Sequence, residues 1–481
     1  SASAAAHPRP GRPGVSGATI DFDLTQDGGQ AKVRIANGAL DLPGVFEESL
    51  VPFDQLAADA QWKFSGRKIE AQLRNLQFAN ADAQGQAQAS WRTEDVAGPA
   101  PAADAPDRRF PGVLDLQGSL SRGDGARVHR YLPLVLPEPV RHYVRDAVVQ
   151  GQVSDVKFKV KGPLEHLPFT NPALGDFRVS AKIRNGHFAY VPKTIQPTGA
   201  APWPALTELG GELVFDRASL EVNGANGKVA GLPGLQLVKG DARIPDLTHD
   251  STVHVNVDLK GALADALGFV NQSPVGGMTS HALATARAGG TGDYRFRLEL
   301  PIHSIDKSRV EGTVTLPGND VQFAAAVPML SKLKGVVNVS EKGFSVAGGQ
   351  AKLLGGDVRF DGGLRSQPRA TGSAETETVA TFKAQGNVTA EGLRQARELG
   401  PLARMAQSAS GGTAYTATLG FRRGMPELAI SSSLQGMALN LPAPLSKTAE
   451  AALPLRLENA LLQASMGPGQ KLEDQLSVSI G

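Results

Sequence analysis

The strongest constraint on the fold is a period-two alternation of apolar and polar residues in short segments separated by glycines. It is clearest in Leu333–Gly362, which contains three such segments, broken at Gly343, at Gly348–Gly349 and at Gly355–Gly356. An earlier stretch, Leu213–Gly231, follows the same plan of strand, turn, strand, Gly-rich turn and strand. Two copies of one β-meander unit predict a repetitive β architecture, in which each strand has one apolar and one wet face.

The alternation continues along most of the chain, beginning with Ile20, Phe22 and Leu24. More than a dozen strands are expected, and an antiparallel sheet that large curls, splits or closes. The predicted fold class is therefore mainly β: an extended, repetitive antiparallel sheet with a few short helices. Helical spacing of apolar residues predicts these helices at Pro137–Val149, where Val140, Val144, Ala147 and Val148 share a face, at Leu263–Asn271 and at Leu393–Gln407.

Composition excludes several classes of protein. The 49 basic and 47 acidic residues nearly balance, and no basic stripe with stacking aromatics marks a nucleic-acid surface. No run of about 18 apolar residues is present, so no helix is expected to span a bilayer. The absence of cysteine suits an oxidising compartment. The start lacks the apolar region of a signal peptide, and both ends resemble cuts within a longer chain, so we expect an internal fragment.

The sequence predicts no catalytic residue, no metal ligand and no cofactor. The pairs His129/His142 and His249/His254 lack the spacing of common metal sites. Neither Gly224–Gly227 nor Gly289–Gly292 opens a convincing helix after a buried parallel strand, as a phosphate loop would. There is also no Gly-x-Ser-x-Gly nucleophile elbow.

Several motifs, taken in order, resemble the YhdP family. In the middle of the chain they are Tyr131-Leu132-Pro133 with the helix that follows, Gly162-Pro163-Leu164, Phe188–Pro192 and Trp203–Leu206. Near the end, Ser431–Lys447 is similar to the family signature of small polar residues followed by L-x-G-[ML]-x-[LI]-x-L-P-x-P-L-x-K. Gly335–Gly356 resembles the family's AsmA-like repeat. The resemblance extends from about Ile20 to the end.

The resemblance implies a periplasmic protein of Gram-negative bacteria, related to AsmA and to bridge-like lipid transfer proteins. It implies anchoring to the inner membrane through an N-terminal helix that this chain does not contain. The expected partners are phospholipids, the inner and outer membranes, and an unidentified periplasmic or outer-membrane protein. The sheet is then expected to curl into an open groove that carries acyl chains without enzymatic chemistry.

On this basis the chain divides into six expected segments. They are a linker at 1–17, a β-groove segment at 18–93, a Pro/Ala-rich loop at 94–111, a central β-groove module at 112–365 with the helix near 137–149, a loop at 366–377, and an AsmA-like C-terminal β segment at 378–481. The expected groove lining consists of apolar residues at alternating strand positions: Val156, Phe158, Val160, Val255, Val257, Phe296, Leu298, Val337, Val339, Phe344, Val346 and Leu419.

Alternation by itself leaves other possibilities open. The apolar faces are equally compatible with a closed, filled sandwich core, as in a structural or adhesive β-repeat protein. A polysaccharide-active enzyme of β architecture would instead need two carboxylates that meet in space, and no pattern points to such a pair. The row Lys157, Lys159 and Lys161 suits anionic lipid headgroups, but it also suits ordinary protection of a sheet edge.

Overall fold

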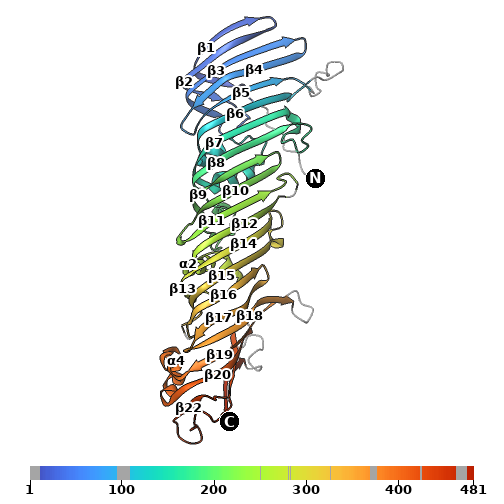
Figure 1. Ribbon diagram of the computed structural model, residues 1–481. Helices are drawn as coiled ribbons and strands as arrows, with labels where there is room; N and C mark the ends of the chain where they lie inside the picture. The colour runs from blue at the N-terminus through green and yellow to red at the C-terminus, as the bar shows by residue number, and fades with distance from the viewer. Residues whose placement is uncertain are drawn as a thin grey trace. The chain divides into compact units, whose positions relative to one another are not determined.

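The protein was examined as a computed structural model, which describes residues 11–94, 109–249, 251–279, 281, 283–325, 327–368, 376–422, 425–461 and 474–481. The described part is mostly β, antiparallel and open, with a few short helices, so the predicted fold class is confirmed. The chain separates into two units (Figure 1). Unit 1 comprises Ser1–Gly231, Leu237–Val255 and Pro301–Ile305, and unit 2 comprises Leu232–Gln236, Asn256–Leu300 and Asp306–Gly481.

Unit 1 is a meander in which each strand pairs antiparallel with the next one along the chain. Its strands are β1 (Gly14–Thr25), β2 (Gly28–Asp41), β3 (Leu50–Ser65), β4 (Lys68–Ala79), β5 (Ala83–Arg92), β6 (Val113–Asp124), β7 (Val148–Pro163), β8 (Asp176–Phe188), β9 (Leu206–Asp216) and β10 (Ser219–Val229). Two further strands, β11 (Leu232–Ile244) and β12 (Thr252–Ala262), are divided between the units.

Unit 2 is also built from antiparallel pairs, but some of its strands pair with the next strand but one along the chain. Its strands are β13 (Arg287–Gly289), β14 (Thr291–Pro301), β15 (Arg309–Gln322), β16 (Leu330–Ser340), β17 (Gly343–Leu353), β18 (Gly356–Pro368), β19 (Thr376–Thr389), β20 (Ala409–Arg422), β21 (Met425–Ser432), β22 (Met437–Leu439), β23 (Leu455–Leu461) and β24 (Asp474–Ile480). The loop expected at 366–377 is flanked by β18 and β19, and its central residues 369–375 lie outside the described part.

The helices are short and interrupt the meander at a few connections. They are α1 (Glu138–Ala147), α2 (Leu263–Gln272), α3 (Pro274–Met278), α4 (Ala390–Gln395) and α5 (Pro401–Met405), with 3₁₀ turns η1 (Gly125–Tyr131), η2 (Leu164–His166), η3 (Lys193–Ile195), η4 (Ile305–Lys307), η5 (Arg397–Leu399) and η6 (Ala406–Ser408). In unit 2, α2 follows β12 and α4 follows β19, an even number of antiparallel steps later. Both therefore lie at the same edge of the sheet, as Figure 1 shows.

Two of the three predicted helices form as expected, and the third is divided. The segment Leu393–Gln407 was expected to be one helix, but it is split between α4, η5, α5 and η6. Gly400 has a φ of 54°, which stops helical geometry, and the following Pro401 has no N–H to donate to the preceding turn. Proline is instead tolerated in the first turn of a new helix, where α5 begins.

Helix α1 buries Ala147 of the predicted apolar face but leaves Val140 of that face exposed. Val140 is 46% exposed, whereas Arg141 is buried together with Ala147. The buried Arg141 guanidinium donates a hydrogen bond to the Leu136 carbonyl, and its Nε lies 3.5 Å from a carboxylate oxygen of Glu47. The apolar periodicity thus predicts the helix and the buried position of Ala147, but it does not predict that a paired arginine is buried as well.

A buried polar cluster connects η1 to the sheet of unit 1. The Arg130 guanidinium lies 2.6 Å from Asp82 Oδ2, and the Tyr131 hydroxyl donates to the same oxygen at 3.0 Å. Asn80 donates to the Tyr131 oxygen at 3.1 Å, and the ring of Tyr131 meets that of Phe46 edge-on. Since the Asp82 side chain is only 10% exposed, its carboxylate depends on these partners.

Bulges recur along the strands of unit 1, and several place a non-glycine residue in the left-handed region. Asn75, Asp155 and Asn185 have φ values of 53°, 52° and 51°, and the register shifts in each of their strands. Asn and Asp tolerate this conformation better than other side chains. A bulge bends its strand and increases the local twist, so these positions curve the sheet.

We predict that Arg130→Met destabilises unit 1 by about 3 kcal/mol, because it leaves the buried Asp82 carboxylate without its cation. Chemical denaturation followed by circular dichroism measures the change. Lys161→Gln is the control: its ammonium lies 3.2 Å from Asp115, but its side chain is 61% exposed, so the cost should stay below about 1 kcal/mol. Equal costs for the two variants would contradict a structural role for the buried pair.

Candidate functional site

An apolar row crosses the sheet of unit 2, with one residue from each of the consecutive strands β14 to β21. Each member lies directly opposite the next in the antiparallel register, so all of their side chains project from the same face. We call this the unit 2 row: Tyr294, Val314, Val337, Val346, Gly362, Phe382, Leu419 and Leu428. At about 4.8 Å between strands, the row is about 34 Å long.

Unit 1 has an equivalent row from β1 to β8. Its members are again direct cross-strand partners, and none of them is polar. This unit 1 row consists of Phe22, Ala31, Ala60, Leu73, Ala89, Leu116, Val160 and Phe177. Each row is close in length to the hydrocarbon thickness of a bilayer, about 30 Å.

The residues predicted as groove lining lie on these faces. Val337, Val346 and Leu419 belong to the unit 2 row and Val160 to the unit 1 row. The remaining members flank the rows at two-residue spacing or lie on β12, where apolar and exposed polar positions alternate: Val156, Phe158, Val255, Val257, Phe296, Leu298, Val339 and Phe344. The structure thus brings most of them together within their own unit. Their contact with lipid stays a prediction.

Burial distinguishes this face from an ordinary core. Of the twelve predicted lining residues only Val156, 6% exposed, is buried, and the other eleven remain partly exposed. The apolar face of β1 is even more exposed to solvent, since Phe22 is 63% exposed. Side chains in a filled sandwich would be covered by a second layer and would become buried. Within each unit, these side chains are shielded mainly by their neighbours on the same sheet.

At five places on the apolar faces, the ring of an aromatic residue covers the glycine directly opposite it on the neighbouring strand. The direct cross-strand pairs are Gly29/Trp62 and Gly118/Phe158 in unit 1, and Gly312/Phe296, Gly349/Phe360 and Gly362/Phe382 in unit 2. In each pair the ring occupies the space above the glycine, so an added Cβ would collide with it; at Gly349 it would lie 2.7 Å from the Phe360 ring. The rings therefore lie low over the backbone.

The opposite face carries charges that are largely matched. Of the predicted lysine row, Lys159 lies 2.9 Å from Asp176 and Lys161 lies 3.2 Å from Asp115. Arg178 pairs with Asp216 at 2.7 Å in the same way. Cross-strand partners of opposite charge neutralise this face, so the lysine row is less basic than its sequence indicates.

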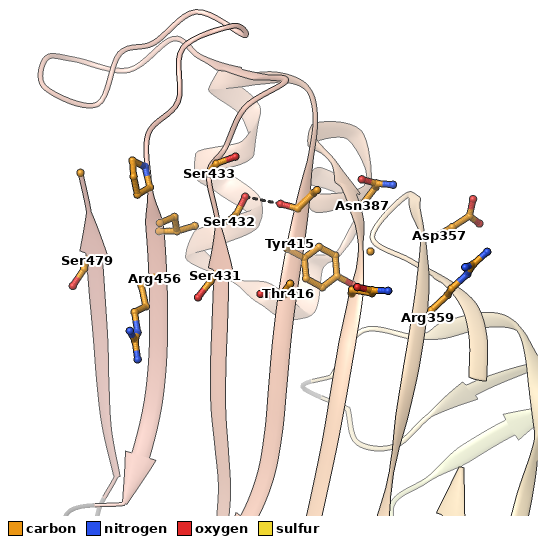
Figure 2. Close-up of a pocket in the computed structure, with 16 residues that line it drawn as sticks. Asp357, Arg359, Asn387, Tyr415, Thr416, Ser431, Ser432, Ser433, Arg456 and Ser479 are labelled. Carbon is orange, nitrogen blue, oxygen red and sulfur yellow. Dashed lines mark hydrogen bonds between the residues drawn. The ribbon is translucent and has the colours of Figure 1, made fainter. Parts of the chain in front are cut away.

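A cleft of about 910 Å³ opens in unit 2 among β18, β19, β20, β21, β23 and β24 (Figure 2). Its side chains are mainly polar, and none of the twelve predicted lining residues contributes to it. Arg359 and Gln385 point to the face opposite Phe360 and Ala384, their apolar neighbours in β18 and β19. Tyr415 lies at the cleft, where burial raises its pKa and no described residue hydrogen-bonds its buried hydroxyl.

The histidines do not assemble into a metal or catalytic centre. His142 lies 3.4 Å from Glu47 Oε1 and 3.6 Å from Glu138, and the hydrogen bond from His142 is the main cause of a lowered Glu47 pKa. His249 bonds Asp246 within one exposed turn, at 2.8 Å. Among the described residues, no group of three or more His, Cys, Asp or Glu side chains could hold a metal ion.

The polar cleft was not predicted from the sequence. Its residues come from short runs on different strands, such as 385–387, 414–416 and 454–456, and no sequence pattern links these runs. Their proximity depends on the register of distant strands, which no local pattern encodes. The nearest sequence signal was the segment Ser431–Lys447, which resembles the family signature and whose first three residues, Ser431, Ser432 and Ser433, line the cleft.

Comparison with known proteins identifies one family. The model of the YhdP protein family matches residues 3–480, nearly the full chain. No curated protein matches, and no solved structure matches. This family is not a known enzyme family, and membership is consistent with lipid transport in general. Among the described helices, none has the length and apolar character needed to cross a bilayer.

We predict that Gly349→Ala costs about 1–3 kcal/mol of stability, because the new methyl group forces the Phe360 ring out of its place. Gly289→Ala is the control, since an added Cβ there meets no atom within 4 Å. In a double-mutant cycle, Phe360→Leu should recover part of the loss, which thermal unfolding would measure. Strictly additive costs for the two substitutions would show that the ring does not occupy the glycine's space.

Proposed function

The chain belongs to the YhdP family, and on that premise we propose that it carries phospholipids between the inner and outer membranes of a Gram-negative bacterium. Acyl chains lie against the apolar faces of the two units while headgroups face water. The proposal places the protein in the periplasm, anchored to the inner membrane by a segment outside this chain. Its partners are phospholipids, the two membranes and a further envelope protein.

The observation that carries the proposal is the pair of apolar rows. Each crosses eight strands with no charged member, and most of its side chains are only partly buried. Monomeric soluble proteins rarely expose contiguous apolar patches larger than a few hundred Å². A hydrocarbon ligand would complete the burial of these faces, and each buried methylene contributes about 0.8 kcal/mol.

The mechanism is passive movement along a nearly uniform surface. Because successive strands present similar aliphatic side chains, an acyl chain gains similar free energy at each position and meets no deep trap. The sequence has no nucleotide-binding motif, so the proposal requires direction to come from the membranes or from another protein. Each unit then presents its own lipid-binding surface.

Partial burial favours this function over a filled structural repeat. A structural or adhesive repeat would use the apolar faces as its core, and its stability would depend on their complete coverage. An enzyme of β architecture would require convergent acidic residues in a cleft, and among the described residues that line the cleft of Figure 2, only Asp357 has a carboxylate side chain. Neither alternative accounts for two half-exposed apolar rows.

We predict that Val339→Asp blocks transport, because a carboxylate on the apolar face would lie in contact with acyl chains. Asn338→Asp is the matched control: it adds the same charge one position away, on the exposed face. A complementation assay and a fluorescent-lipid transfer assay measure the effect, with thermal unfolding to verify folding. If a folded Val339→Asp protein transported lipid as well as Asn338→Asp, the apolar face would not be the lipid path.

We also predict that the purified chain carries phospholipid from its host, with several molecules bound to each chain. Native mass spectrometry and lipid extraction count them, and Val339→Asp should lower the number while Asn338→Asp should not. A folded, monomeric protein that is consistently free of lipid would favour the filled structural repeat instead.

A further inference from the structure

The polar cleft of unit 2 contains an ordered row of side chains. Successive cross-strand partners form it, one from each of β18, β19, β20, β21, β23 and β24. We call it the polar row: Arg359, Gln385, Thr416, Ser431, Arg456 and Ser479. All six line the cleft, and Figure 2 shows the labelled members side by side across neighbouring strands.

The polar row differs from the rest of the face on which it lies. Elsewhere in unit 2, several charged residues on exposed strand positions have partners, as Arg295 with Asp258 at 3.8 Å and Lys260 with Asp293 at 3.7 Å. The polar row contains no acidic residue, and its arginines lie beside the amide of Gln385 and the hydroxyl groups of Thr416 and Ser431 instead. A surface that served only for solubility would not need a run of uncharged hydrogen-bonding groups between two arginines.

Among the described residues that line the cleft, one cationic side chain has no ionic partner. Three charged side chains line it: Asp357, Arg359 and Arg456. Asp357 is held 2.9 Å from the Lys352 ammonium, and Arg456 donates from Nε to Glu458 at 2.8 Å. No described residue forms an ion pair or a hydrogen bond with the Arg359 guanidinium. The cleft therefore presents an unmatched positive charge together with neutral donors.

We propose that this cleft binds a phosphoryl group, held by Arg359 and by the amide and hydroxyl donors beside it. A guanidinium can bind two phosphoryl oxygens at once, which makes arginine well suited to phosphate. Gln385 and Thr416 lie one and two strand spacings from Arg359, about 4.8 Å each, so their donors can reach the remaining oxygens. A carboxylate has only two oxygens and would leave some of these donors unused.

The phosphoryl group has two possible sources, a soluble phosphate ester or the headgroup of a phospholipid. This inference does not rest on lipid transport, because the polar row alternates with the unit 2 row along the same strands and so projects from the opposite face of that sheet. Both sources share the chemistry that Arg359 would recognise.

The test is binding of defined probes to the whole chain and to variants of Arg359. Isothermal titration with inorganic phosphate and with glycerol 3-phosphate tests the soluble source. Sedimentation with vesicles of phosphatidylcholine containing phosphatidylglycerol tests the headgroup. Arg359→Gln should weaken binding at least about tenfold, which is about 1.4 kcal/mol. Arg359→Lys, which keeps the charge but loses the bidentate fork, should fall between it and the wild type.

Arg309→Gln is the matched control, because Arg309 lies on an exposed position of β15, 3.9 Å from Glu299 and outside the cleft. It should leave binding unchanged, and circular dichroism should show all the variants folded. Arg359-dependent binding of a soluble probe, or of vesicles alone, supports the site and identifies its source. Absence of saturable binding to every probe, or equal binding by Arg359→Gln and the wild type, would overturn the proposal.

Discussion

The structure depends on the antiparallel backbone ladder, which satisfies the polar groups of each strand without a second layer. A strand of a meander needs only its two neighbours for hydrogen bonds, so the sheet extends by repetition rather than by enclosing a core. The apolar side chains then gain shelter from cross-strand partners such as Val337 and Val346. Where a compact domain would bury this face completely, the ladder leaves it partly exposed.

Helices and 3₁₀ turns pack against the strands at a few places. In unit 1 the Arg130–Asp82 pair and the Tyr131 hydroxyl fix η1 against the strands, and α1 follows with a buried arginine. In unit 2 the turn of α4 approaches the β17–β18 connection, where Val388, Ala390, Ala409 and Met437 form a small buried cluster. These helices lie at sheet edges and close small cores there, while the rows across the strands stay partly exposed.

The sequence allowed the fold class to be predicted because period-two alternation is a local property. Val156 and Lys157, or Val337 and Asn338, reveal their faces without reference to any other strand. Helix positions at 138–147 and 263–272 followed from local spacing for the same reason. The family resemblance supplied the rest of the functional expectation, and the match over residues 3–480 confirms the family.

What local patterns could not supply depends on register and on long-range partners. The burial of Arg141 in α1 was not predicted, because its partner Glu47 lies 94 residues earlier in the sequence. The bulges at Asn75 and Asp155 have no marker in alternation, since asparagine and aspartate also occupy ordinary wet positions. The polar row joins residues from 359 to 479, and only the paired strands bring them together.

The glycine–aromatic pairs have a consequence for anything that moves over the apolar faces. A phenylalanine that stands upright on a sheet is a ridge, and a hydrocarbon crossing it must lose contacts before it regains them. Seated over Gly118, Gly312, Gly349 or Gly362, the same ring adds apolar area with little added height. The pairs therefore reduce the corrugation of the surface potential, so that attraction can be strong while the barriers between neighbouring positions stay low. The affinity of the surface for a hydrocarbon then depends on the apolar side chains, and the barriers to its movement depend on the glycines that keep the rings low.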